Sequence, residues 1–119
     1  MKKILIIEDE KPMARALQLK LEKEGFQVEN AYDGIEALKY IENNKYDLIL
    51  TDLVLAKIDG FEIIKNIRSK GIKTPIIVAS NLSQAEDEKK VMELGANHYF
   101  IKSDTPIVSI IENIKNFLK

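Results

Sequence analysis

Acidic side chains at the ends of two apolar runs are the residues of this chain best suited to chemistry. Glu8 and Asp9 directly follow the run Ile4 to Ile7, and Asp52 follows the run Leu48 to Thr51. Apolar runs of this length are typical of buried strands, and parallel strands end at a shared edge of their sheet. Carboxylates held together repel one another unless a cation neutralises them, and Mg2+ prefers such oxygen ligands. The pattern predicts a metal site.

Five short segments with strand-like composition alternate with longer segments of helical periodicity. The predicted strands cover residues 3–7, 27–31, 47–51, 75–79 and 97–101. Typical signals of helix boundaries separate them. These signals are Pro12 in a first turn, Gly25, Gly71 and Gly95 at helix ends, the pairs Asp33/Glu36, Asp59/Glu62 and Ser83/Glu86 at helix starts, and Asp104 with Pro106 before the last helix.

A βα unit repeated five times predicts an α/β fold, with a parallel sheet covered by helices on both faces. The last helix carries an apolar stripe that we expect to face the core. Its members are Ile107, Ile110, Ile111, Ile114 and Leu118. The sequence has no repeat or linker, so we expect residues 1–119 to form a single domain.

Composition excludes several classes of function. The 119 residues carry a net charge of -1, from 18 basic and 19 acidic residues, so no basic surface for nucleic acid is expected. Without cysteine there are no disulfides, thiolate metal ligands or cysteine nucleophiles. The apolar runs are too short to cross a membrane. We therefore expect a cytoplasmic protein that contacts neither membrane nor nucleic acid directly.

The residues at the strand ends together resemble the receiver domain of two-component response regulators, the CheY-like family, over essentially the whole chain. The matching positions are Glu8, Asp9, Asp52, Asp59, Gly60, Ser80 after the fourth strand, and Tyr99 and Lys102 at the end of the fifth. The resemblance implies a flavodoxin-like (βα)5 fold with strand order 2-1-3-4-5. It also implies a signalling switch rather than an enzyme.

The resemblance assigns a role to each acidic residue. Asp52 would be the phosphoacceptor, because a carboxylate can act as a nucleophile and carry a covalent acyl phosphate. Glu8 and Asp9 would bind Mg2+, Asp9 directly and Glu8 through water, and Asp52 would contact the metal as well. The backbone carbonyl of Val54 would be a further metal ligand. In such a site Mg2+ offsets charge on the transferred phosphoryl group.

Three further residues would complete the switch. Lys102 would contact a phosphate oxygen, and the hydroxyl of Ser80 would donate a hydrogen bond to another. Tyr99 would turn inward as Ser80 moves, or would be an ordinary tyrosine at a strand edge. The responding surface would consist of the fourth helix, fifth strand and fifth helix. The implied partners are a histidine kinase or phosphotransfer protein, a small phosphodonor, an effector protein or domain, and a second copy of the chain after phosphorylation.

The chain departs from the family pattern at two places, and two further positions bear on the lifetime of the phosphoryl group. Leu55-Ala56 replaces a common Met-Pro pair, which we expect to affect loop stiffness more than chemistry. Ser103 follows Lys102 where the family usually has proline after a cis bond, and a trans bond is expected here because cis costs about 3–4 kcal/mol before other residues. In the family, the residues two beyond the phosphoacceptor and two beyond the switch hydroxyl influence the water that hydrolyses the acyl phosphate. Here they are Val54 and Leu82, whose apolar side chains cannot orient that water, so the resemblance implies slow loss of the phosphoryl group.

Two other functions fit parts of the pattern. A receiver-like module that is never phosphorylated would act as a constitutive protein-interaction domain; Asp9, Asp52 and Lys102 argue against it. An FMN-binding flavodoxin would share the strand order, but its phosphate would need a Ser/Thr-rich loop where this chain has Glu8-Asp9-Glu10. The sequence favours the phosphorylated receiver.

Overall fold

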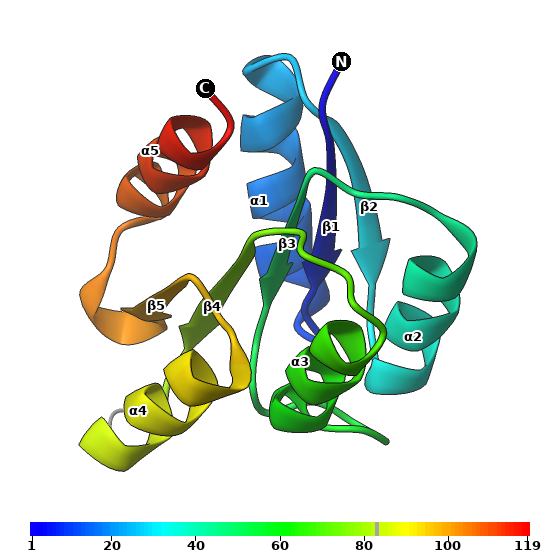
Figure 1. Ribbon diagram of the computed structural model, residues 1–119. Helices are drawn as coiled ribbons and strands as arrows, with labels where there is room; N and C mark the ends of the chain where they lie inside the picture. The colour runs from blue at the N-terminus through cyan, green and yellow to red at the C-terminus, as the bar shows by residue number, and fades with distance from the viewer. Residues whose placement is uncertain (83) are drawn as a thin grey trace.

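A computed structural model describes residues 1–82 and 84–119 and confirms the alternation of strands and helices (Figure 1). The strands are β1 (Lys3–Ile7), β2 (Gln27–Ala31), β3 (Leu48–Thr51), β4 (Ile76–Ser80) and β5 (His98–Ile101). The helices are α1 (Lys11–Lys23), α2 (Gly34–Asn43), α3 (Gly60–Ser69), α4 (Ala85–Leu94) and α5 (Ile107–Phe117), with a short 3-10 turn, η1, at Lys102–Asp104.

All described strands lie in one parallel sheet of order β2-β1-β3-β4-β5, which confirms the predicted topology. Strand β1 ends opposite the end of the central strand β3, because Ile7 pairs with Thr51. The ends of β4 and β5 likewise lie opposite each other, because Ser80 pairs with Ile101. The residues that follow these pairs therefore emerge at the same edge of the sheet.

Alternating side chains of the strands form two separate cores. Ile4 and Ile6 of β1 pack with α1 and α5 on one face of the sheet. Leu5 and Ile7 pack with α2, α3 and α4 on the other face. The predicted stripe of α5 faces the first of these cores: Ile110, Ile111 and Ile114 are buried there, and Ile107 and Leu118 pack against them. Helices therefore cover both faces of the sheet, as predicted.

Most of the predicted helix boundaries agree with the structure. Gly25, Gly71 and Gly95 follow the ends of their helices with positive φ angles of 93°, 75° and 112°. Asp33 caps α2, because its side chain accepts the backbone N–H of Glu36 at 2.8 Å. Asp59 caps α3 in the same way, accepting the backbone N–H of Glu62 at 3.0 Å. Pro12 lies in the first turn of α1, where its missing N–H costs nothing.

Some predicted boundaries were wrong or remain outside the described residues. Ser80 is the last residue of β4 rather than the first residue after it, because its backbone still pairs with β5. Strands β3, β4 and β5 each begin one residue later than predicted. Asp104 does not open α5, which follows Pro106 without a side-chain cap. The proposed cap at Ser83 lies outside the described residues, and α4 follows Gln84.

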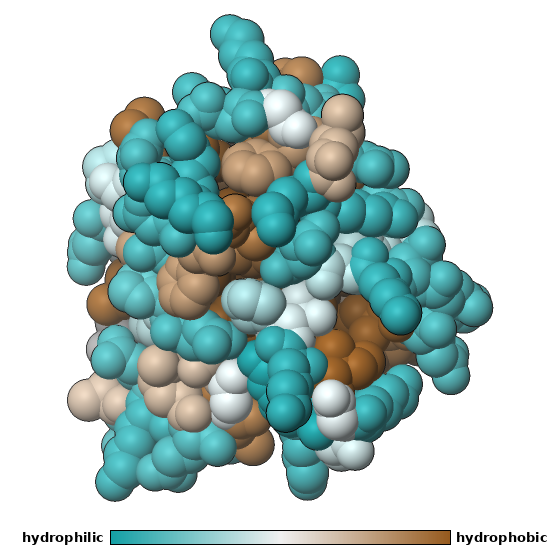
Figure 2. All heavy atoms as spheres, turned by 45° about the horizontal axis from the view of Figure 1, so that its top comes forward, coloured by the Kyte–Doolittle hydropathy of each residue, from teal (hydrophilic) through white to brown (hydrophobic). Residues whose placement is uncertain are grey.

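Figure 2 shows the molecule obliquely, with the end at which the strands begin turned towards the viewer, and hydrophilic side chains cover most of the surface in view. Hydrophobic surface forms smaller patches between them, some in hollows and some at the outline of the view. Within residues 1–82 and 84–119, every helix is too short or too polar to span a membrane.

Candidate functional site

The acidic residues meet at the edge where β1 and β3 end. The backbone N–H of Asp52 donates to the carbonyl of Ile7 at 3.0 Å, and the N–H of Glu8 donates to Ala31 at 3.0 Å. The ladder of the sheet thus continues one residue beyond each strand. One carboxylate oxygen each from Glu8, Asp9 and Asp52 lies within 4.8 Å of the others. The predicted acidic cluster therefore exists.

The carboxylate of Asp52 is held at both oxygens. Its Oδ1 accepts the backbone N–H groups of Leu53 at 2.6 Å and Val54 at 3.3 Å. Its Oδ2 accepts a hydrogen bond from the Lys102 ammonium at 2.7 Å. Asp52 is only 7 % exposed, so these charge-assisted bonds operate away from bulk water. The carboxylate is oriented before any ligand arrives.

Lys102 lies between two carboxylates at the base of the site. Its ammonium forms ion pairs with Asp52 and with Oε1 of Glu8, and Glu10 lies 3.7 Å away. The Lys102 side chain is 7 % exposed and that of Glu8 is 3 % exposed. Lys102 therefore lies at the acidic cluster, while its contact with a phosphate oxygen stays a prediction. Its peptide bond to Ser103 is trans, as expected, since the described residues contain no cis bond.

Burial and pairing shift the pKa values of these groups in defined directions. Burial raises the pKa of Glu8, and the hydrogen bonds from Lys102 and from the Glu10 backbone only partly oppose this. Burial by itself would lower the pKa of Lys102, but its hydrogen bonds to Asp52 and Glu8 outweigh that and raise the pKa. The cluster contains three carboxylates, and the Lys102 ammonium pairs with two of them, Glu8 and Asp52. The excess of negative charge favours a further cation here.

Ser80 and Tyr99 lie beside this cluster and share one neighbouring residue, Leu82. Ser80 is fully buried, and its Oγ accepts the Leu82 backbone N–H at 3.3 Å. The Tyr99 hydroxyl donates to the Leu82 carbonyl, and burial raises the pKa of Tyr99. Within the described residues Ser80 makes no hydrogen bond to Asp52. Tyr99 lies in the edge strand β5 and is bonded to the segment after β4, and its role as a switch residue stays a prediction.

The loop after β3 packs tightly against Asp52. A Cβ atom on Gly60 would lie 2.2 Å from the Asp52 carbonyl oxygen, so only glycine allows α3 to begin this close to the site. The Val54 side chain is 61 % exposed, while its N–H points to Asp52. The role of the Val54 carbonyl as a metal ligand stays a prediction.

Some contacts of the site had not been predicted from the sequence. They are the backbone N–H of Leu53, the approach of Glu10 to Lys102, and the Thr51 hydroxyl, which donates to the Asp52 carbonyl at 2.8 Å. Glu10 could have been found because it continues the acidic pair. Backbone donors carry no signal in the residue type.

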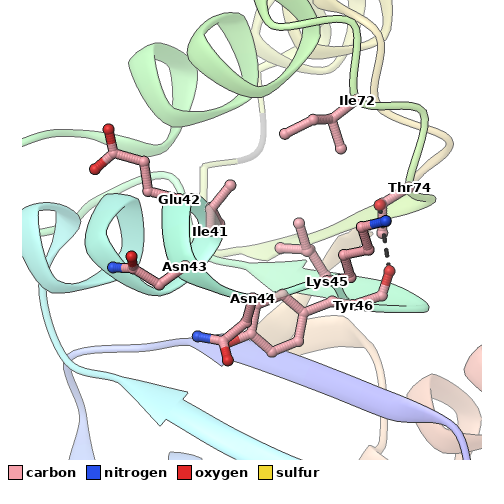
Figure 3. Close-up of a pocket in the computed structure, with 9 residues that line it drawn as sticks. Ile41, Glu42, Asn43, Asn44, Lys45, Tyr46, Ile72 and Thr74 are labelled. Atoms are coloured by element: carbon pink, nitrogen blue, oxygen red, sulfur yellow. Dashed lines mark hydrogen bonds between the residues drawn. The ribbon is translucent and has the colours of Figure 1, made fainter.

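A separate cavity of about 490 Å³ lies among the end of α2, the start of β3 and the segment before β4 (Figure 3). Ile41 and Ile72 line it, and Thr74 donates to the Tyr46 carbonyl at 3.3 Å. None of its described lining residues belongs to the acidic cluster. This cavity lies apart from the chemistry described above.

Known proteins resemble the chain in both sequence and structure. The transcriptional regulatory protein DltR of Streptococcus agalactiae is 40% identical over 100 residues, which are 84% of this chain and 45% of DltR. The alkaline phosphatase synthesis transcriptional regulatory protein PhoP of Bacillus subtilis is 40% identical over 105 residues, 88% of this chain and 44% of PhoP. This chain therefore spans less than half the length of either relative.

A solved structure shares the fold closely. Response regulator TrrA of Thermotoga maritima, solved in complex with Mg2+ and BeF, superposes with a TM-score of 0.87 at 30% identity and covers 98% of this chain and 99% of its own. The family model of the response regulator receiver domain matches residues 4–114. The chain therefore belongs to the response regulator receiver domain family.

Proposed function

We propose that this chain is a phosphorylation-switched receiver that accepts a phosphoryl group on Asp52 in the presence of Mg2+. The donor would be the phosphohistidine of a histidine kinase or phosphotransfer protein, or a small phosphodonor. The observation that carries the proposal is the joint position of Asp52 in the acidic cluster and next to the Lys102 ammonium. Membership of the receiver family supports it.

The donor set suits a hard divalent cation. Glu8, Asp9 and Asp52 offer carboxylate oxygens only, and Asp9 is exposed, so an ion can enter from solvent. The Val54 carbonyl would add a neutral oxygen. When bound, Mg2+ would offset negative charge on the phosphoryl group. The Mg2+ and BeF complex of TrrA is consistent with this assignment.

The residues of this chain would supply positioning and charge. An Asp52 oxygen would attack the phosphorus, and the bond from phosphorus to the donor nitrogen would break, with its electron pair going to that nitrogen. The N–H groups of Leu53 and Val54 already fix the carboxylate, which reduces the entropic cost of this step. Lys102 would exchange its bond to Asp52 for one to a phosphoryl oxygen.

The same site would operate the switch. The Ser80 hydroxyl accepts the Leu82 backbone N–H, and its own O–H would donate a hydrogen bond to a phosphoryl oxygen, which would draw Ser80 towards Asp52. Movement of Ser80 would be passed through Leu82 to Tyr99, whose hydroxyl bonds to the Leu82 carbonyl. Phosphorylation would thereby bias two arrangements of the α4, β5 and α5 surface.

Residues 1–119 would act as one receiver unit. DltR and PhoP are named as transcriptional regulators, and the chain matches less than half of each. The output of the switch would therefore pass to an effector domain or a separate effector protein, with homodimerisation through the α4, β5 and α5 surface as one route.

Beryllofluoride, a stable mimic of the phosphoryl group, tests the proposal. We expect the wild-type protein to bind it only with Mg2+, as followed by two-dimensional NMR, and Asp52→Asn to lose the response. Asp47→Asn is the matched control, because Asp47 is exposed and lies just before β3, at the end of that strand opposite Asp52. A wild-type protein that gives no response would instead support a constitutive interaction module.

A further inference from the structure

One hydrogen bond joins the segment after β4 to the segment after β5. The backbone N–H of Ser103 donates to Oδ1 of Asn81 at 3.0 Å. Asn81 follows Ser80, and Ser103 follows Lys102, so the bond lies just beyond the last pair of the β4–β5 ladder. The Asn81 side chain thus supplies an acceptor where the backbone pairing of these strands has ended.

We infer that Asn81 is a positioning residue for Lys102, acting through the backbone of Ser103, and that it sets the rate of phosphoryl transfer to Asp52. The inference rests on the proposed function and deepens it. Asn81 would not touch the phosphoryl group. Its effect would come from fixing the point from which the Lys102 side chain extends towards Asp52.

Lys102 needs such an anchor because its side chain is long and flexible. A lysine side chain carries about 2 kcal/mol of rotamer entropy, and its ammonium offers no planar geometry to fix its direction. Pairing in β5 ends at Ile101, and the turn at η1 adds one long bond, from the Thr105 N–H to the Lys102 carbonyl at 3.3 Å. The Asn81 bond is shorter and lies at the next residue along the chain.

Asn81 and Lys102 are also neighbours at the surface of the site. Both line a recess of about 240 Å³ together with Glu10, Met13 and Ser103. The bond requires a backbone N–H at position 103, which proline does not have. In this chain Ser103 provides that N–H where the family pattern usually has proline. The Asn81 contact is therefore available because of this departure.

Matched variants separate the backbone donor from the serine side chain. Asn81→Ala removes the acceptor, Ser103→Pro removes the donor, and Ser103→Ala keeps the donor while removing the hydroxyl. Asn81→Asp keeps an acceptor oxygen. The measured quantity is the rate of Asp52 phosphorylation by phosphoramidate, with Mg2+ affinity and thermal stability measured on the same samples.

We expect Asn81→Ala and Ser103→Pro each to slow phosphorylation about fivefold, the factor that corresponds to about 1 kcal/mol for a typical hydrogen bond. The double variant should be no slower than either single variant, because both remove the same bond. Ser103→Ala should match the wild type, and Asn81→Asp should be faster than Asn81→Ala. Mg2+ affinity should not change, because the proposed metal ligands lie on other segments.

Three results would overturn the inference while leaving the proposed function intact. The first is an Asn81→Ala protein that is phosphorylated as fast as the wild type. The second is a double variant whose loss equals the product of the two single losses. A loss of rate that follows a loss of thermal stability or Mg2+ affinity would also count against a positioning role. A wild-type protein that takes no phosphoryl group would overturn both proposals.

Discussion

Replacing Lys102 by methionine removes the ammonium that lies between Glu8 and Asp52. Both carboxylates are nearly buried, with 3 % and 9 % of their side chains exposed, so neither can recover full hydration. Removing one partner of a buried ion pair costs about 3–5 kcal/mol. For a domain of this size each 1 kcal/mol corresponds to about 4 °C, so the melting temperature should fall by about 12–20 °C.

The loss of stability caused by Lys102→Met should depend on Mg2+ and on pH. A bound cation would replace the missing charge, so Mg2+ should stabilise Lys102→Met more than the wild type. Without Lys102 the pKa of Glu8, already raised by burial, should rise further. The folded variant then binds more protons than the unfolded chain, so its stability falls as the pH rises from the ordinary value of 4.5 through the raised value. The difference in the free energy of unfolding between the wild type and Lys102→Met should therefore become smaller at acidic pH.

Urea unfolding followed by far-UV circular dichroism measures these differences, since the chain has no tryptophan to report by fluorescence. Lys115→Met is the control, because Lys115 pairs with Glu24 at 2.9 Å on an exposed surface where little stability is expected. The reasoning is refuted if Lys102→Met is no less stable than Lys115→Met, or if Mg2+ stabilises the wild type more than the variant.

Three further outcomes follow from individual contacts. Phosphorylated Asp52 should persist well beyond seconds, because the side chains of Val54 and Leu82 cannot orient water; decay within seconds in a phosphate-release assay would contradict this. Gly60→Ala should lower the free energy of unfolding by about 1–3 kcal/mol, because the added Cβ would lie 2.2 Å from the Asp52 carbonyl oxygen. A variant whose urea midpoint equals that of the wild type would refute that packing. The hydrogen bond from Lys3 lowers the pKa of Glu29, so its contribution to stability is present above pH 4.5 and is lost as the pH falls through the lowered value. Glu29→Gln should therefore be less stable than the wild type near neutral pH, and the two proteins should become equally stable as acid is added. A difference in stability that persists below the lowered pKa would argue against the contact.

The strand ends could be predicted because two strong sequence signals coincide there. The apolar runs before Glu8 and Asp52 mark buried parallel strands, and the carboxylates that follow mark the shared edge. Helix ends were predictable where glycine or a capping aspartate was required, as at Gly95 and Asp59. The start of α5 was not, since Pro106 precedes it and Asp104 lies in the turn η1.

The parts that could not be predicted depend on three-dimensional neighbours. Lys102 was expected to meet a phosphate, yet its ion pairs with Asp52 and Glu8 come from the packing of separate strand ends. Ser80 was expected after its strand, because residue type does not reveal that its backbone still pairs with β5. The bond from Ser103 to Asn81 joins residues 22 positions apart, so only the fold reveals it.

Intact mass spectrometry after incubation with phosphoramidate and Mg2+ tests the central claim most directly. We predict that the wild-type protein gains the mass of one phosphoryl group, and that Asp52→Asn or removal of Mg2+ with a chelator prevents the gain. A wild-type protein whose mass does not change, or an Asp52→Asn protein that is modified to the same extent, would contradict the assignment of Asp52 as the phosphoacceptor.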